Sequence, residues 1–236
     1  MHFKNDVECD SFINAHSISE KNQLALIAEN GHVLRFSGDY SILTKYKGRP
    51  MPKEIGIGKA STFVGFCHAH DCSTFAEIDT QPLEPNKKMM ALYAYRSLCR
   101  AYFAKENAVD LMRSMARRPE LDSKNAEICD LSANGHEIGL KSIQPHKHEY
   151  ENAILTQSFE NFRYVLFQST SAMDLQLAGV LYPEYDFFGD VLQLLGIQSA
   201  KYELISFFSA PMSTGWGFCF AWHKSSDSKC VHFIKS

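Results

Sequence analysis

The segment "FVGFCHAHDCSTFAEID" (residues 63–79) contains two cysteines, two histidines, two aspartates and one glutamate. Thiolates, imidazoles and carboxylates are the groups that bind metal ions and transfer protons in proteins. Cys67 and His70 form a Cys-x-x-His pair that follows a strand-like run and precedes helix-like sequence. Residues three apart lie on one face of a helix, so both side chains can reach one tetrahedral ion. A helix N-terminus also favours the thiolate form of Cys67.

A second cysteine–histidine pair lies upstream. Cys9 and His16 flank the segment "SFINA", whose alternating pattern predicts a short strand between them. Together Cys9, His16, Cys67 and His70 supply two thiolates and two imidazoles, a set typical of structural Zn²⁺. We therefore predict a zinc site with these four ligands. The alternative is that His16 caps the following helix and Cys67 packs in the core.

The order of a ligand, a strand, a second ligand and then two ligands at a helix start resembles a treble-clef finger. It also resembles the His-Me finger (HNH) nucleases, many of which are built on that frame. The resemblance covers the first third of the chain at most. It implies that His16 is the general base and that Asn30 or His32 takes the middle position of the motif. It also implies that His70, with Asp71 beside it, holds a catalytic metal ion on the helix.

The chain departs from the family pattern at two places. Ala15 precedes His16 where the family often has Asp, and neither cysteine pair is a Cys-x-x-Cys knuckle. One imidazole cannot be both a zinc ligand and a free base, so a zinc-bound His16 would leave the base role to His68 or His32. In the nuclease interpretation a neutral imidazole activates water, while a divalent ion such as Mg²⁺ or Mn²⁺ polarises the phosphate.

A basic stretch around "YKGRPMPK" favours a nucleic-acid partner for such an enzyme. The side chains that could line a phosphate surface are Lys45, Lys47 and Arg49, together with Arg35 and Lys59. The alternative for each of them is a solvated loop. The other class of function is a non-catalytic protein that binds a protein partner, in which zinc only stabilises the fold.

Composition limits the remaining possibilities. The 236 residues include 24 Lys or Arg and 27 Asp or Glu, so a net charge of -3 gives no global basic field. No apolar run approaches the ~20 residues that cross a bilayer, and the N-terminus lacks the apolar stretch of a signal peptide. We therefore expect a cytoplasmic protein with no membrane partner. The seven cysteines would then stay reduced and free to bind metal.

Three segments differ in pattern and together predict an α+β fold. Residues 1–85 suggest a zinc-binding, treble-clef-like module of short elements, and residues 86–160 a helical hairpin. Residues 161–236 change to a period of two and suggest an antiparallel β-rich segment. The three segments can share one core, because no linker separates them.

Several individual elements follow from the same patterns. A helix is predicted from Asn86 to Arg118, and a second one with Pro145 in its first turn, on which His146 and His148 are solvent-exposed. "YKGRPMPKEIGIG" predicts a loop, and "FFGDVLQLLG" a short helix. Four strands are predicted at "FRYVLFQ", "KYELISFF", "WGFCFAWH" and "KCVHFIK", with "SDSK" as a hairpin turn and the aromatic side chains of "WGFCFAWH" on the buried face.

Overall fold

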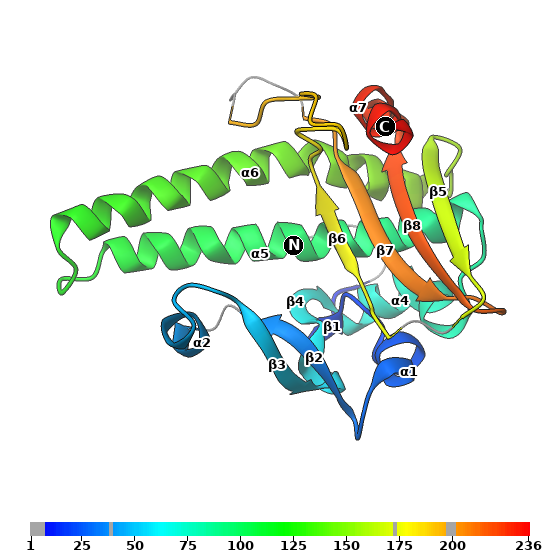
Figure 1. Ribbon diagram of the computed structural model, residues 1–236, viewed down its shortest axis with the longest axis horizontal. Helices are drawn as coiled ribbons and strands as arrows, with labels where there is room; N and C mark the ends of the chain where they lie inside the picture. Colours follow the sequence, from blue (N-terminus) through cyan, green and yellow to red (C-terminus); the bar gives the residue numbers. More distant parts are fainter. Residues whose placement is uncertain (1–7, 38–39, 172–173, 197–201) are drawn as a thin grey trace.

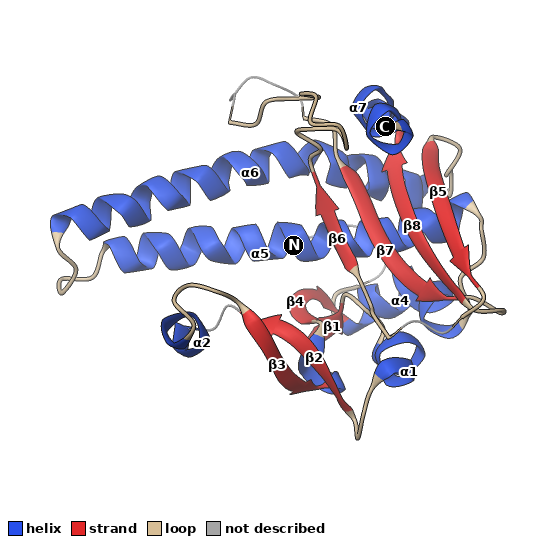
Figure 2. Ribbon diagram, in the orientation of Figure 1, coloured by secondary structure: helices blue, strands red, loops and turns tan. Residues whose placement is uncertain are grey.

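The fold is α+β, as the sequence predicts. The computed structural model describes residues 8–37, 40–171, 174–196 and 202–236. A long helical hairpin lies across one face of a four-stranded antiparallel sheet, and the short N-terminal elements lie along the hairpin on the side away from α6 (Figures 1 and 2).

The hairpin consists of α5 (Lys87–Ala116) and α6 (Ser123–Thr156). Each begins at a polar cap: Asn86 accepts a hydrogen bond from the backbone N–H of Met89, and Asp122 accepts one from Asn125. The predicted first helix is confirmed. No helix in the described part of the chain is long and apolar enough to cross a membrane.

The prediction for Pro145 is wrong. This residue lies inside α6 rather than in a first turn. Proline removes one backbone hydrogen bond from a helix interior, at a cost of about 3 kcal/mol. The helix continues because its residues on both sides of the proline, including Ile143, His146 and Tyr150, are buried.

The C-terminal sheet has the strand order β5-β8-β7-β6, with antiparallel neighbours throughout. Its strands are β5 (Phe162–Ser169), β6 (Ala178–Leu181), β7 (Ile205–Pro211) and β8 (Trp216–His223). The small side chains of β8 face the hairpin, and Cys219 Sγ lies 3.3 Å from Met90 Sδ of α5. The predicted burial of the aromatic face is therefore only partly right: Phe218 and Phe220 stay half-buried. A helix can approach a sheet most closely over small residues. The small side chains of β8 therefore face the hairpin and the core.

Two predicted elements near the C-terminus are wrong. "KCVHFIK" belongs to helix α7 (Asp227–Lys235), which follows the 3-10 turn η2 (Lys224–Ser226) and buries Cys230 against Ile205 and Trp222. Trp222 Nε1 donates a 2.8 Å hydrogen bond to Asp227 in the first turn. "SDSK" is thus a helix start rather than a hairpin turn.

The segment "FFGDVLQLLG" is an irregular loop and not the predicted helix. The Asp186 carboxylate accepts hydrogen bonds from the backbone N–H groups of Phe188 and Asp190, both at 2.9 Å. Gly189 has a φ of 94°, a conformation that glycine adopts without strain. The side-chain hydrogen bonds of Asp186 replace those of a helix and hold a turn.

The N-terminal third contains two separate strand pairs. β1 (Phe12–His16) pairs with β4 (Thr62–Cys67), and β2 (His32–Ser37) pairs with β3 (Met51–Gly56), both antiparallel. The other elements are η1 (Glu20–Leu24), α1 (Ala25–Ile27), α2 (Tyr40–Lys45), α3 (Ile57–Ala60) and α4 (His68–Thr80). "YKGRPMPKEIGIG" is therefore only partly a loop, since it includes β3.

One hydrophobic cluster contains residues of all three predicted segments. Phe66 comes from the first segment, Met90 and Tyr95 from the second, and Phe208 and Cys219 from the third. The predicted segment boundaries at 85/86 and 160/161 fall between elements. Whether each segment is a domain of its own stays a prediction.

An ion pair between the buried Arg96 and the partly exposed Asp79 joins α4 to α5. Arg96, whose side chain is 3% exposed, donates two hydrogen bonds of 2.6 Å to the Asp79 carboxylate. Its guanidinium carbon lies 4.2 Å from the centroid of the Phe75 ring. Removing one partner would leave the other charge buried without compensation.

We expect Asp79→Ala to lower the free energy of unfolding by about 3 kcal/mol. The matched control is Glu77→Ala, which removes the pair that Glu77 forms between the same two helices with Lys88, a lysine whose side chain is 45% exposed. This control should cost less than about 1 kcal/mol. Urea unfolding measures both values, and equal losses would contradict the assigned role of the Arg96–Asp79 pair.

Candidate metal centre

The start of α4 carries two of the predicted metal ligands. Cys67 is the last residue of β4 and the N-cap of α4, and His70 lies in the first turn of that helix. The register of the β1–β4 pair places Phe12 opposite Cys67, and His68 N–H donates a 3.0 Å hydrogen bond to Ser11 O. Pairing of two strands distant in sequence therefore brings Cys9, just before β1, to the start of α4.

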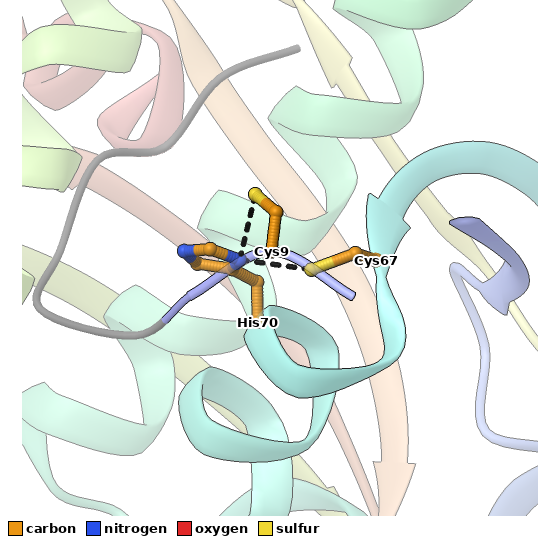
Figure 3. Close-up of side chains that lie close together, drawn as sticks. All are labelled: Cys9, Cys67 and His70. Carbon is orange, nitrogen blue, oxygen red and sulfur yellow. Dashed lines mark hydrogen bonds between the residues drawn. The ribbon is translucent and has the colours of Figure 1, made fainter. Parts of the chain in front are cut away.

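Cys9, Cys67 and His70 form a group whose ligand atoms all lie within 4.8 Å of one another. His70 Nδ1 is 2.9 Å from Cys67 Sγ and 3.6 Å from Cys9 Sγ, and the three side chains converge in Figure 3. Ligand atoms around a tetrahedral Zn²⁺ are separated by roughly 3.5–3.8 Å, as the Zn–S and Zn–N bond lengths require. The group could thus close around an ion with small side-chain movements.

The three side chains of the group differ in solvent exposure. Cys67 is 3% exposed and His70 is 5% exposed, whereas Cys9 is exposed and covers them from the solvent side. Desolvation raises the pKa of Cys9, and the neighbouring Cys67 and Asp10 raise it further. A divalent cation would relieve this repulsion, because it stabilises both sulfurs as thiolates.

His16 is not part of this group. It is the last residue of β1 and lies opposite Thr62, at the far end of the ladder from Cys67. From Phe12 to His16 the strand advances about 13 Å. His16 Nδ1 lies 3.2 Å from Ser61 Oγ, and Nε2 lies 3.4 Å from Glu20 Oε2. Burial lowers the pKa of His16, and the opposing effect of Glu20 is smaller. The lowered pKa favours a neutral ring near pH 7.

Neighbouring side chains fasten the Cys9 segment to α4. Asp10 accepts a 3.1 Å hydrogen bond from Ala69 N–H, which lowers the pKa of its carboxyl group. The other Asp10 oxygen lies 3.6 Å from His68 Nδ1, and His68 Nε2 lies 3.5 Å from Cys72 Sγ. Neither Asp10 nor Cys72 is among the predicted site residues, although both are close in sequence to predicted ligands.

Of the remaining residues implied by the His-Me resemblance, Asn30 and His32 lie apart from the group, whereas Asp71 follows His70 in α4. Asn30 and His32 are at the turn before β2, where His32 Nδ1 lies 2.9 Å from Asn30 O. Asp71 is half-buried, and burial raises the pKa of its carboxyl group. Its Oδ1 has no hydrogen-bond partner among the described residues.

The predicted basic surface is exposed. Lys45 ends α2, and Lys47 and Arg49 follow it in a turn, with Lys45 Nζ 5.1 Å from the centroid of the Tyr46 ring. Solvent access is the condition that a phosphate surface requires.

His146 corrects the prediction of two exposed histidines, because it is 2% exposed while His148 is exposed. Its Nδ1 and that of His223 each lie 3.3 Å from Glu149 Oε2, and its Nε2 lies 2.8 Å from Tyr202 O. Burial alone would raise the pKa of Glu149, but hydrogen bonds with the two histidines hold it well below its usual range. The spacing of His146 and Glu149 was the available signal for this cluster.

No protein-family model matches this chain. No curated protein and no solved structure matches it either.

The geometry makes a spectroscopic prediction. Chelator-treated protein titrated with Co²⁺ should develop thiolate-to-metal absorption, and His70→Ala should weaken Co²⁺ binding by at least about tenfold. His16→Ala should bind Co²⁺ as the wild type does, because His16 lies at the other end of the ladder. Loss of the absorption in a folded His16→Ala protein, checked by circular dichroism, would place His16 among the ligands.

Proposed function

We propose that this protein binds one Zn²⁺ through Cys9, Cys67 and His70, and that the ion stabilises the unit formed by β1, β4 and α4. The observation that carries the proposal is the convergence of these three side chains within 4.8 Å. Two of them come from the start of α4 and the third from a segment that precedes β1.

The donor set favours zinc over the other common divalent ions. Two sulfurs and one imidazole nitrogen suit Zn²⁺, whereas Mg²⁺ and Ca²⁺ prefer oxygen ligands. Three protein ligands leave one tetrahedral position for water or a further ligand. The site would tie Cys9, which lies on an exposed segment, to a buried helix start.

If the zinc only stabilises the fold, the activity of the protein is to bind a protein partner. The loop that contains "FFGDVLQLLG" supports this proposal, because it exposes several large apolar side chains: Phe187, Phe188, Val191 and Leu194. Exposed apolar clusters of this kind mark protein-binding surfaces.

Elemental analysis should find about one zinc per wild-type chain, and Cys67→Ser should lose it. Cys72→Ser is the matched control, because Cys72 is an exposed cysteine of the same helix outside the group. A chelator should lower the melting temperature of wild type and Cys72→Ser, and should not affect Cys67→Ser. Absence of zinc from the wild type, or equal zinc in both variants, would refute the proposal.

A second candidate is a metal-dependent nuclease that acts on nucleic acid. The observation in its favour is the element order: His16 ends β1, β4 pairs with β1, and α4 follows with His70 in its first turn. This is the layout that the His-Me resemblance implies. The separation of about 13 Å along the ladder weighs against it, because a general base must lie within hydrogen-bond reach of its water. Such an enzyme would place Mg²⁺ or Mn²⁺ nearer His16, with Lys45, Lys47 and Arg49 on the substrate backbone.

The nuclease candidate predicts cleavage of plasmid or single-stranded DNA in the presence of Mg²⁺ or Mn²⁺. His16→Ala should then abolish cleavage, by at least about a hundredfold, while it keeps its fold and zinc content. No cleavage by wild-type protein with either ion would leave the stabilising role of zinc as the sole candidate.

A further inference from the structure

A cleft of about 900 Å³ lies on the N-terminal third, apart from the three candidate metal ligands. Its walls come from the β2–β3 hairpin, the α3–β4 junction, α5 and the segment before β6. Pockets of this size hold small organic ligands in proteins. The lining is mixed, with apolar residues such as Leu24, Ile27 and Leu175 beside polar and charged ones.

Two arginines of this lining bind backbone carbonyls of the same α3–β4 junction. Arg35 Nη1 donates a 3.0 Å hydrogen bond to Ala60 O, and Arg100 Nη1 donates a 2.9 Å hydrogen bond to Thr62 O. The two acceptors are only two residues apart at the α3–β4 junction. The Arg100 guanidinium also lies 5.7 Å from the centroid of the Phe63 ring. The Nη1 group of each guanidinium is thus bound to the backbone, and the other N–H groups remain available to a ligand.

Three carboxylates line the same cleft, but among the described residues none lies within ion-pair distance of Arg35 or Arg100. Neither Arg35 nor Arg100 forms an ion pair with any residue in the described ranges, in contrast to Arg96, Arg113 and Arg163. The carboxylates of the cleft are those of Glu29, Glu54 and Asp174, and none of them pairs with either guanidinium. Burial lowers the pKa of Arg100, and the charge of Arg35 lowers it further. Two guanidiniums that lack ion-pair partners favour binding of an anion at this end of the cleft, and the three carboxylates of the lining oppose it elsewhere.

We propose that this cleft binds a small organic phosphate, with the phosphate group between the guanidiniums of Arg35 and Arg100 and the organic part against the apolar lining. A dianion matches two neighbouring guanidiniums, whereas one guanidinium fork already satisfies a carboxylate. A volume of about 900 Å³ accommodates a nucleotide-sized molecule. The proposal is independent of zinc, since no ligand of the metal centre lines the cleft.

Isothermal titration calorimetry at low salt tests this site, with adenosine monophosphate, inorganic phosphate and acetate as probes. Wild-type protein should bind adenosine monophosphate more tightly than inorganic phosphate, and acetate least. Arg35→Gln should weaken binding of adenosine monophosphate by about tenfold or more, because a charge-assisted contact is lost. Because Arg35 is exposed, this variant should fold. A thermal unfolding curve like that of the wild type verifies the fold.

Arg117→Gln is the matched control, because it removes one exposed arginine outside the cleft and should leave binding unchanged. An equal loss in both variants would show general charge attraction and overturn the proposal. So would equal binding of acetate, or no binding of either phosphate probe. A single-stranded oligonucleotide serves as a further probe, and binding of the oligonucleotide alone would assign the arginines to a nucleic-acid backbone and refute the small-ligand site.

Discussion

Burial of the first half of α5 is the constraint on which the rest of the structure depends. Every residue from Met89 to Cys99 is buried, so each face of this helix must be covered by another element. Tyr93 stacks on Phe208 of the sheet with ring centroids 4.8 Å apart, and Tyr95 stacks on Tyr150 of α6 at 6.2 Å. Tyr95 also contacts Phe66 of β4. The sheet, α6 and the β4–α4 unit therefore stabilise one another through a shared helix.

The candidate metal centre lies where this core ends. Cys67 and His70 are held by elements packed on α5, whereas the Cys9 segment is held only by strand pairing and a few polar contacts. An ion at this point would bind only the folded arrangement of Cys9 and Cys67 with His70, so its binding free energy would add to the stability of the fold. The ion would thus act where the hydrophobic core contributes little.

Strand β4 relates the two candidate sites to each other. Its C-terminal end carries Cys67, and its N-terminal end, at Thr62, accepts the hydrogen bond from Arg100. The strand advances about 16 Å between these residues, so the ligands of one site do not reach the other. Phe63 and Phe66, both buried, hold the strand between the two sites against the core. The same packing therefore positions the candidate metal ligands at one end of β4 and the cleft with the two arginines at the other.

Local sequence determined those elements whose short residue pattern is compatible with only one type of secondary structure. The strands around "SFINA" and "WGFCFAWH", the helix from residue 87, and the Cys67–His70 pair are all encoded within a few residues. The pattern of "KCVHFIK" fitted two periods, and only the packing of Cys230 against Ile205 and Trp222 selected a helix. The approach of Arg35 and Arg100 to one junction left no local signal, because the two residues are distant in sequence and each binds a different carbonyl group there.

The candidate metal ligands also divide into what residue types predict and what the fold decides. Residue types alone indicated a cluster of cysteine and histidine, since thiolates and imidazoles in this number favour zinc. Which of them meet was decided by the β1–β4 register, which places Phe12 opposite Cys67 and His16 opposite Thr62. Strand pairing between segments some fifty residues apart has no local sequence signature, because its free energy comes from the core that both strands cover. The sequence thus determined which chemistry is available, and the tertiary structure decided that Cys9, and not His16, joins Cys67 and His70.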